Sequence, residues 1–381
     1  MNASARPVAI VGVDESDEIG RLPNKSALQL HAEAARNALA DAGIGKEEVD
    51  GLFTAGISPI AIGEYLGIRP RFTDATAVGG GSFLVHVGHA LTAIQAGRCR
   101  VALITSGQSS YSRVGQPTVP PDPASPAGQF ELPYGIFGPT TTFALAALRH
   151  MQQYGTTSEH LAEVAVATRK WAMLHPKALM QTPITVGDVL TSRWICYPFH
   201  LLDCCLVTDA GGAVVLTTAE RARDTRTRPV PVLGVGEATE HLHISQMADL
   251  TTSAASRRAG QQAFAMAGVQ PQEIDVAQIY DAFTFLPSVA LEDLGFCGPG
   301  EGGPFVAGQR TAPGGDFPMN TSGGGLSYTH PGMFGMFLII EAVRQLRSEC
   351  GARQVPGARL ALCHGLGGVF AAAATLILGA E

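Results

Sequence analysis

Short apolar runs that end in glycine alternate along the chain with longer segments of helical period. Residues 7–13 (PVAIVGV) and 229–235 (PVPVLGV) are β-branched runs typical of buried strands. Each precedes a helical stretch, which ends as ALADAGIGKEEVD at 38–50 and as AFAMAGVQPQEID at 263–275. Two such pairs in the same order favour an internal duplication over coincidence.

A third pair of segments extends the duplication. In the first half the glycine-rich turn VGGGS (78–82) leads into an apolar helix and then a strand at 101–107. In the second half SGGGLSYTHPG (322–332) leads into a helix and a strand at 360–365. Buried strands that alternate with helices predict α/β sheets covered on both faces. Both turns are expected at helix N-termini, where unpaired N–H groups and the helix dipole suit a developing oxyanion.

We therefore expect two halves, residues 1–225 and 226–381. Helical periods continue through 141–154 and 158–174 of the first half. Residues 108–139 interrupt this half, because they are rich in Pro, Ser and Gly and show no period. This insertion is either a surface loop or a loop that covers a pocket or a partner.

Composition narrows the classes of function that remain open. The 381 residues are 46% hydrophobic and 15% charged, which is typical of a well-packed globular chain. A net charge of −7 without a Lys/Arg run argues against nucleic acid as a partner. The sequence shows neither a signal peptide nor 18 consecutive apolar residues, so we expect no membrane span and a cytoplasmic location.

Cysteine and histidine spacing gives no sign of a metal site. The seven cysteines include no CxxC pair, so neither a disulfide framework nor a zinc ribbon is indicated within this chain. The HLH sequence at 241–243 is better explained as an exposed strand or loop. We therefore expect no bound metal.

Four segments carry candidate chemistry: VGGGS at 78–82, YDAFT at 280–284, NTSGGGLSYTHPG at 320–332 and LCHGLGG at 362–368. Most have a structural alternative, such as a turn capped by Ser82, a strand end with a half-buried Tyr, or a core Cys beside a solvent His. The third segment argues most strongly for function. Three glycines, a His and a Pro before a helix are unfavourable for the stability of a loop, so we expect the backbone there to approach a ligand or another part of the chain closely.

Together these segments resemble the thiolase superfamily over nearly the whole chain, and its sterol-carrier-protein and lipid-transfer-protein thiolase-like branch in particular. The stretch RWICYPFHLLDCCLVTDAGGAVVL at 193–216 fits this resemblance as well. The resemblance implies a duplicated α/β thiolase fold, a five-layered αβαβα sandwich. It also implies a homodimer and coenzyme A thioester substrates, with no covalently bound cofactor.

The sequence departs from the superfamily where a thiolase has its nucleophile. Gly80 takes the position of the nucleophilic Cys, and glycine has no side chain to acylate. His330, in Thr-His-Pro, matches the Gly-His-Pro histidine of the family, and Cys363 matches its second cysteine, an acid/base for the α-carbon. Tyr280 falls where thiolases use Asn or His to help hold a thioester oxyanion.

This pattern is similar to that of the steroid side-chain aldolases of the lipid-transfer-protein branch. Those proteins lack the nucleophilic Cys and cleave a β-hydroxyacyl-CoA by a retro-aldol reaction. They use one Tyr in the Tyr-Asp-x-Phe motif and a second Tyr at the position held here by His330. They work with a small companion protein that carries an OB fold and a zinc ribbon, so the resemblance implies zinc only in such a companion.

The sequence thus predicts C–C bond cleavage, or its reverse, on a CoA thioester without a covalent acyl-enzyme. Tyr280 or His330 is expected to take the proton from a 3-hydroxyl group, and Cys363 to protonate the α-carbon. Backbone N–H groups are expected to bind the thioester oxyanion at Gly80, Gly81 and Gly324.

Two alternatives stay open at this point. The first is an acyltransferase or β-ketothiolase that uses Cys363 or Ser82 as an unusual nucleophile. The second is a non-catalytic subunit that scaffolds a larger complex. Steroid, aromatic and branched-chain acyl groups all fit the sequence equally well.

Overall fold

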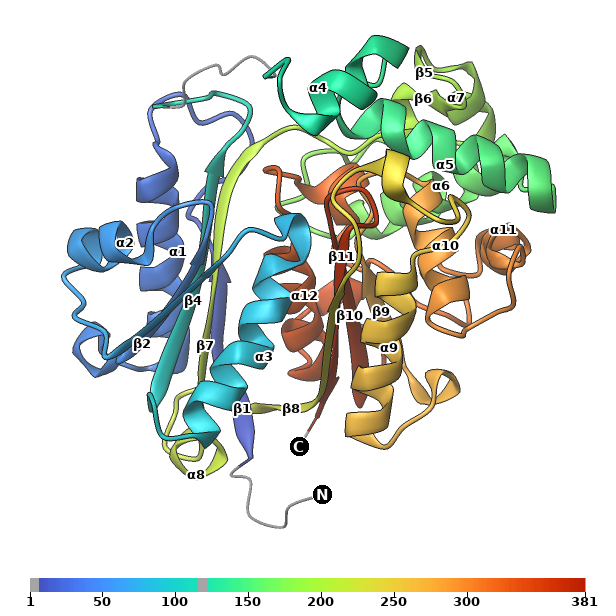
Figure 1. Ribbon diagram of the computed structural model, residues 1–381. Coiled ribbons are helices and arrows are strands. Elements are labelled where there is room, and N and C mark those ends of the chain that lie inside the picture. The colour runs from blue at the N-terminus through green and yellow to red at the C-terminus, as the bar shows by residue number, and fades with distance from the viewer. Residues whose placement is uncertain (1–6, 116–121, 381) are drawn as a thin grey trace.

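A nine-stranded mixed sheet runs through the whole molecule (Figure 1). The computed structural model describes residues 7–115 and 122–380. The strand order is β3-β2-β4-β7-β1-β8-β11-β10-β9. The strands of the first half are β1 (Val8–Glu15), β2 (Gly51–Ala55), β3 (Phe72–Thr76), β4 (Val101–Ser109) and β7 (Asp209–Thr218). Those of the second half are β8 (Val230–Thr239), β9 (Val276–Ile279), β10 (Leu360–Gly367) and β11 (Ala372–Gly379).

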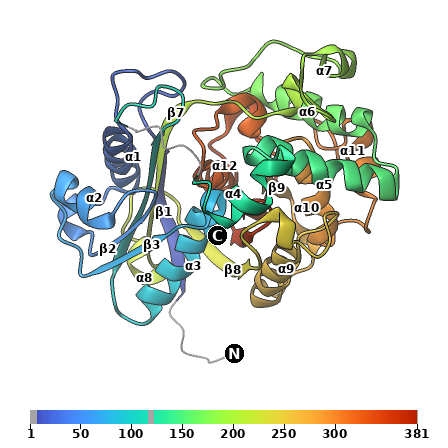
Figure 2. The same cartoon turned by 45° about the horizontal axis from the view of Figure 1, so that its top comes forward.

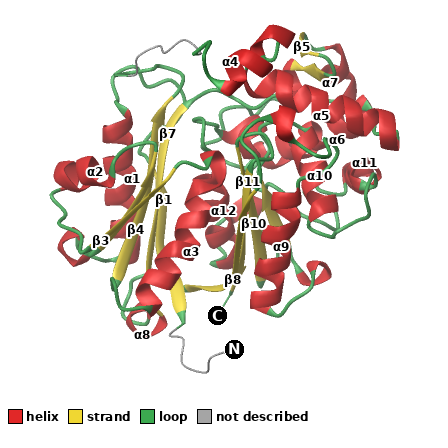
Figure 3. Cartoon of the chain, in the orientation of Figure 1, coloured by secondary structure: helices red, strands yellow, loops and turns green. Residues whose placement is uncertain are grey.

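Helices cover the outer faces of the sheet and fill the space between its two halves (Figures 1 and 3). Helix α1 (Ala27–Ala42) packs on β1, β4 and β7, and α9 (Ala254–Ala267) packs on β8 and β11. Between the halves lie α3 (Ser82–Gln95) and α12 (Gly335–Leu346), each in contact with strands of both. The layers therefore follow the predicted order αβαβα.

The duplicated segments occupy equivalent places. Gly43 ends α1 with φ 70° and Gly268 ends α9 with φ 71°, a left-handed conformation that glycine adopts without strain. A short antiparallel pairing of β1 with β8, through Ala9↔Pro231 and Ile10↔Val230, joins the two halves of the sheet. From this junction the strands run outward as β1-β7-β4-β2-β3 and as β8-β11-β10-β9. The boundary near residue 225 stays a prediction.

A helical layer covers one end of the second half (Figure 2). It holds α4 (Pro126–Phe130), α5 (Gly138–Tyr154), α6 (Ser158–Ala172), α7 (Val186–Thr191) and the hairpin β5 (Trp194–Cys196) and β6 (Phe199–His200). The other α-helices are α2 (Pro59–Leu66), α8 (Ala219–Ala222), α10 (Phe285–Asp293) and α11 (Gly302–Val306). Among the described residues, no helix combines the length and apolar character needed to cross a membrane.

The insertion at 108–139 is more ordered than its sequence pattern predicts. Its residues 116–121 lie outside the described residues, and the remainder contains α4 and the 3-10 turn η3 (Leu132–Tyr134). Ser125 caps α4 by accepting a hydrogen bond from the Gly128 N–H, and Pro126 stands in the first turn. A five-residue helix is too short to show a period. We call residues 126–139 the cover segment.

Candidate active site

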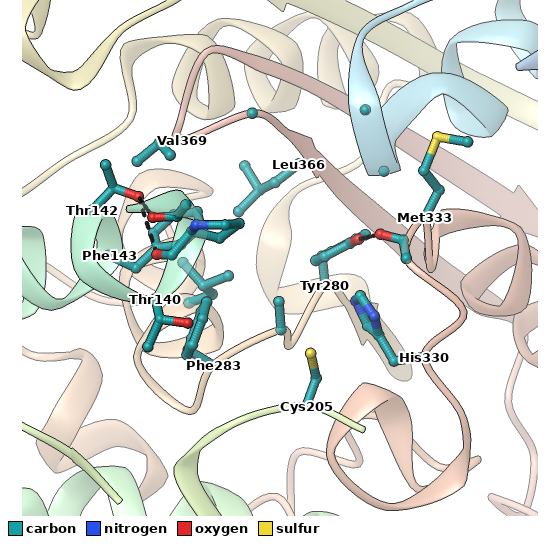
Figure 4. A pocket seen from close by; sticks show the side chains of 18 of the residues that line it. Thr140, Thr142, Phe143, Cys205, Tyr280, Phe283, His330, Met333, Leu366 and Val369 are labelled. Atoms are coloured by element: carbon teal, nitrogen blue, oxygen red, sulfur yellow. Dashed lines mark hydrogen bonds between the residues drawn. The ribbon is translucent and has the colours of Figure 1, made fainter. Parts of the chain in front are cut away.

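The four candidate segments meet at one cavity of about 600 Å³, a size typical of small-molecule sites (Figure 4). Each segment contributes to the lining, together with the cover segment, α5 and the residues Cys205, Leu286, Met333 and Val369. The residues from the four segments are Gly79, Gly80, Tyr280, Ala282, Phe283, His330, Gly332, Leu366 and Gly368. The cover segment contributes Ala127, Glu131, Leu132, Ile136, Gly138 and Pro139. Of the two alternatives for the insertion, covering a pocket is the one that the structure supports.

Tyr280 follows β9, and its hydroxyl both donates and accepts a hydrogen bond. The Tyr280 Oη donates to the Gly332 carbonyl at 3.3 Å and accepts from the Phe334 N–H at 3.2 Å. Its ring lies edge-on to the His330 ring, with centroids 5.6 Å apart (Figure 4). Burial raises the pKa of Tyr280 well above its usual value, so the phenol stays protonated and can donate.

The Tyr280 ring fills the space in which a side chain at position 80 would stand. A Cβ built on Gly80 would lie 2.3 Å from Cε2 and 2.4 Å from Oη of Tyr280. Gly80 has no positive φ, so its backbone does not exclude a side chain; the aromatic ring does. The Tyr280 ring can therefore occupy this place only because residue 80 is a glycine.

Gly80 and Gly81 lie at the start of α3, which begins without a side-chain cap. The prediction that Ser82 caps this helix is wrong, because Ser82 has helical angles (φ −52°, ψ −39°) and is the first residue of α3. Its Oγ is buried and has no hydrogen-bond partner among the described residues. The N–H groups of the first turn thus lack a side-chain acceptor, and an anionic ligand oxygen would be favoured there. Gly80 lies against the Tyr280 ring and lines the cavity, whereas Gly81 packs against Gly365 and is not among the residues that line it.

His330 presents a ring nitrogen that the protein does not satisfy. The backbone N–H of His330 donates to Thr208 Oγ1 at 3.0 Å, and its carbonyl accepts from the Thr208 N–H at 3.2 Å. The residue is 7% exposed, and its ring Nε2 has no hydrogen-bond partner among the described residues. Burial lowers the pKa of His330 to about 4, so the imidazole is neutral at neutral pH.

Two residues expected at the site have other contacts. Cys363 is fully buried within β10, where its thiol donates to the Leu338 carbonyl at 3.5 Å, and it is not among the residues that line the cavity. Gly324 lies in a π-helical turn (Gly324–Tyr328), and its N–H donates to Ser322 Oγ at 3.2 Å. The structure therefore brings neither the Cys363 thiol nor the Gly324 N–H to the cavity.

The second glycine-rich turn is not the N-terminus of α12, contrary to the expectation from sequence. Helix α12 begins only at Gly335, after the His330 loop. A Cβ on Gly324 would lie 2.0 Å from Asp281 Oδ2, and the Gly325 N–H donates to Asp281 Oδ1 at 2.7 Å. The glycines thus allow a buried carboxylate to approach the turn, and burial raises the pKa of Asp281 to about 7.

Sequence reasoning missed two residues that shape this site. Asp281 anchors the turn before His330, and Cys205 lines the cavity with its sulfur directed toward Tyr280 and His330 (Figure 4). A signal existed for Cys205, because it lies within the stretch 193–216 that supports the family resemblance. No group of three or more His, Cys, Asp or Glu side chains in the described part of the chain could hold a metal ion.

Comparisons with known proteins agree with this geometry. Residues 236–380 match the family described as "Thiolase C-terminal domain-like". The "17-hydroxy-3-oxo-4-pregnene-20-carboxyl-CoA lyase" of Mycobacterium tuberculosis is 36% identical over 356 residues, covering 89% of this chain and 91% of that protein. The "Acetyl-CoA acetyltransferase" of Methanothermobacter thermautotrophicus is 32% identical, covering 98% and 99% of the two chains.

A solved structure extends the similarity to three dimensions. The chain superposes on a chain of the "Ltp2-ChsH2(DUF35) aldolase" with a TM-score of 0.90 and 34% identity, covering 98% of each chain. The predicted fold class is thereby confirmed. The chain belongs to the thiolase superfamily, as an enzyme of its sterol-carrier-protein and lipid-transfer-protein thiolase-like branch.

Proposed function

We propose that this enzyme cleaves a 3-hydroxyacyl-CoA by a retro-aldol reaction and forms no acyl-enzyme. The observation that carries the proposal is the Tyr280 ring, which stands where a nucleophile on residue 80 would project. The alternative nucleophiles are poorly placed. Ser82 Oγ has no base beside it among the described residues, and the Cys363 thiol contacts the Leu338 carbonyl rather than the cavity.

The environments of Tyr280 and His330 divide the acid and base roles between them. Sequence alone left open which of the two is the base. The raised pKa of Tyr280 keeps its proton on the oxygen, whereas the lowered pKa of His330 leaves its ring neutral and able to accept one. His330 Nε2 also has no protein partner among the described residues, whereas Tyr280 Oη already has two. We therefore assign His330 as the base.

The reaction follows from these positions. His330 takes the proton from the 3-hydroxyl group, the C2–C3 bond breaks, and a ketone or aldehyde leaves. The electron pair of that bond remains on the thioester as an enolate. The N–H group of Gly80 stabilises the enolate oxygen, together with the hydroxyl of Tyr280, whose O–H turns from the Gly332 carbonyl, 3.3 Å away, to the substrate. One well-placed donor of this kind is worth about 3–4 kcal/mol.

The cavity supports a bulky apolar acyl group. Its walls carry Leu132, Ile136, Phe143, Phe283, Leu286 and Val369, with Thr140, Thr142 and Glu131 as polar groups among them. The relative named 17-hydroxy-3-oxo-4-pregnene-20-carboxyl-CoA lyase supports a polycyclic substrate of this kind. Coenzyme A is then part of the substrate and is not a resident cofactor.

A small companion protein and a second copy of the chain are the proposed partners. The solved relative is an aldolase whose name joins two proteins, Ltp2 and ChsH2, which supports a companion here. The cover segment exposes three aromatic side chains close together in the sequence, namely Phe130 (64% exposed), Tyr134 (82%) and Phe137 (63%). A cluster of exposed apolar side chains, unlike a single one, is typical of a surface that binds another protein. For a homodimer, β3 has a free edge, because it is the terminal strand of the sheet and, within the described part of the chain, pairs with β2 alone.

The test is turnover of a steroid CoA thioester with a hydroxyl on C3 of the acyl chain. The purified chain, with its companion, should release the ketone and the shortened acyl-CoA in equal amounts. Intact mass of the enzyme during turnover should show no acyl adduct. An adduct would support the acyltransferase alternative, and absence of turnover with every acyl class tried would support the scaffold alternative.

A further inference from the structure

The thioester enolate needs a proton on its α-carbon, and Cys205 is the thiol that the cavity offers. All seven cysteines lie within the described residues, and Cys205 alone among them lines the cavity. In Figure 4 its sulfur points toward the space bounded by Tyr280 and His330. Cys363, the donor implied by the family resemblance, contacts the Leu338 carbonyl of α12.

Backbone hydrogen bonds fix Cys205 between the two segments that carry Tyr280 and His330. On one side the Cys205 N–H donates to the Ala282 carbonyl at 2.9 Å. On the other side the Leu206 N–H donates to the Gly325 carbonyl at 2.9 Å, and Thr208 exchanges two hydrogen bonds with the backbone of His330. The segment 204–208 thus bridges both segments, and its position does not depend on side-chain packing alone.

The unpartnered Nε2 of His330 is an independent sign that a ligand belongs beside Cys205. This nitrogen is buried, belongs to a residue that lines the cavity, and has no acceptor or donor among the described residues. A buried polar atom of this kind is costly unless a ligand or water satisfies it. In a 3-hydroxyacyl thioester the hydroxyl oxygen is on C3 and the α-carbon is the next atom of the chain. The acid for the α-carbon must therefore lie close to the base for the hydroxyl.

We propose that Cys205 protonates the α-carbon, a step that rests on the retro-aldol function proposed above. The S–H bond breaks, its proton forms the new C2–H bond, and the electron pair stays on sulfur as a thiolate. His330, which holds the proton from the 3-hydroxyl group, returns that proton to the thiolate directly or through water. The net change is one proton moved from the hydroxyl to C2, so no oxidant, reductant or second substrate is needed.

The surroundings of Cys205 suit an acid and disfavour a nucleophile. Burial, with the Asp281 charge nearby, raises the pKa of the Cys205 thiol well above its usual range. The thiol therefore stays protonated at neutral pH and does not attack the thioester. An enolate carbon is a far stronger base than a thiolate, so the transfer remains favourable.

Exchange of the α-proton separates this step from bond cleavage. The probe is propionyl-CoA in deuterium oxide, because it carries an α-carbon and no 3-hydroxyl group. The wild-type enzyme should exchange deuterium into its α-position, and the rate should rise with pH, since the thiolate removes the proton. Cys205→Ala should lower the rate by about 10²–10⁴-fold, the usual contribution of an acid or base. His330→Ala should lose cleavage, whereas its exchange should fall less than that of Cys205→Ala, because water can still take the thiol proton.

The matched control is Cys204→Ser, whose thiol donates to the His200 carbonyl at 3.4 Å and does not line the cavity. It should retain both cleavage and exchange. Cys205→Ser keeps the side-chain size and serves if the alanine variant does not fold. Wild-type exchange in a folded Cys205 variant, or loss of exchange in Cys363→Ser alone, would overturn the assignment. Absence of cleavage by the wild-type enzyme would instead overturn the proposed function, and exchange would still test Cys205.

Discussion

Gly80→Ala tests whether the Tyr280 ring is what keeps position 80 free of a side chain. The added Cβ would lie 2.3–2.5 Å from Cε2, Oη and Cζ of Tyr280. Ordinary contacts between carbon atoms are about 3.5–4.0 Å, so the ring must retreat by more than about 1 Å. That movement breaks the hydrogen bonds of Tyr280 Oη with the Gly332 carbonyl and the Phe334 N–H.

The expected losses of stability and of kcat follow from the displacement of the Tyr280 ring. Forcing an extra methyl group into a packed site costs about 1–3 kcal/mol of stability. Loss of one oxyanion donor lowers kcat by about 10²–10³-fold. We therefore expect Gly80→Ala to fold with reduced stability and to lose kcat by that factor, measured by chemical denaturation and by ketone release. Gly80→Cys should behave alike and gain no efficient thiolysis.

Two further variants isolate the cause. Gly88→Ala is the matched control in the same helix, because its Cβ would meet Val235 at an ordinary 3.7 Å. It should keep full activity and gain about 0.5–1 kcal/mol of stability from the loss of a helical glycine. Introducing Gly80→Ala into a Tyr280→Ala background should cost little stability, since the clash is gone. Full kcat and unchanged stability in Gly80→Ala would refute the reasoning.

Four further outcomes are expected. Tyr280→Phe should lower kcat by about 10²–10³-fold and stability by about 1–3 kcal/mol, because the buried Phe334 N–H loses its acceptor; wild-type kcat would contradict the role of Tyr280 as a donor. His330→Ala should lower kcat by about 10²–10⁴-fold, and the double variant should lose less than the product of the two effects, because both residues serve one step. Burial lowers the pKa of His364 to about 3, so below about pH 6.5 the unfolded chain binds a proton at this residue that the folded chain does not. The free energy of unfolding should therefore fall by up to about 1.4 kcal/mol per pH unit because of this residue. Urea unfolding measured at several pH values should show a weaker dependence of this free energy on pH in His364→Gln. Replacing exposed Phe130 and Tyr134 with Ser should weaken co-elution with the companion while changing stability by less than about 0.5 kcal/mol, and an unchanged complex would place the companion elsewhere.

The segments that form the site could be found from sequence, because glycine-rich turns and isolated polar residues interrupt an otherwise apolar pattern. Which side chain within a segment faces the cavity could not. In β10 successive side chains point to opposite faces, so Cys363 and His364 cannot both reach one site, and their order alone does not say which does. In the structure Cys363 faces α12, and His364 hydrogen-bonds Thr375 and Ser256.

Cys205 was missed for a different reason. Its position is set by backbone hydrogen bonds to Ala282 and, through Leu206, to Gly325, residues far away in the sequence. No local period or turn signal records such contacts. The cover segment was likewise predicted as unstructured, since its helix α4 spans only Pro126–Phe130. Long-range contacts, rather than local preference, place the parts of the site that sequence analysis did not recover.

The cover segment has one further consequence, because its two faces meet different surroundings. Leu132 and Ile136 line the cavity, whereas Phe130 and Tyr134 face outward. An acyl group inside and a protein outside would therefore be two ligands of one short stretch of chain. If the bound protein raises the affinity for the acyl group by some factor, thermodynamic linkage requires that the bound acyl group raise the affinity for the protein by the same factor. The lifetime of the protein complex would then report how fully the enzyme is loaded, and an empty enzyme would release its companion sooner than a working one.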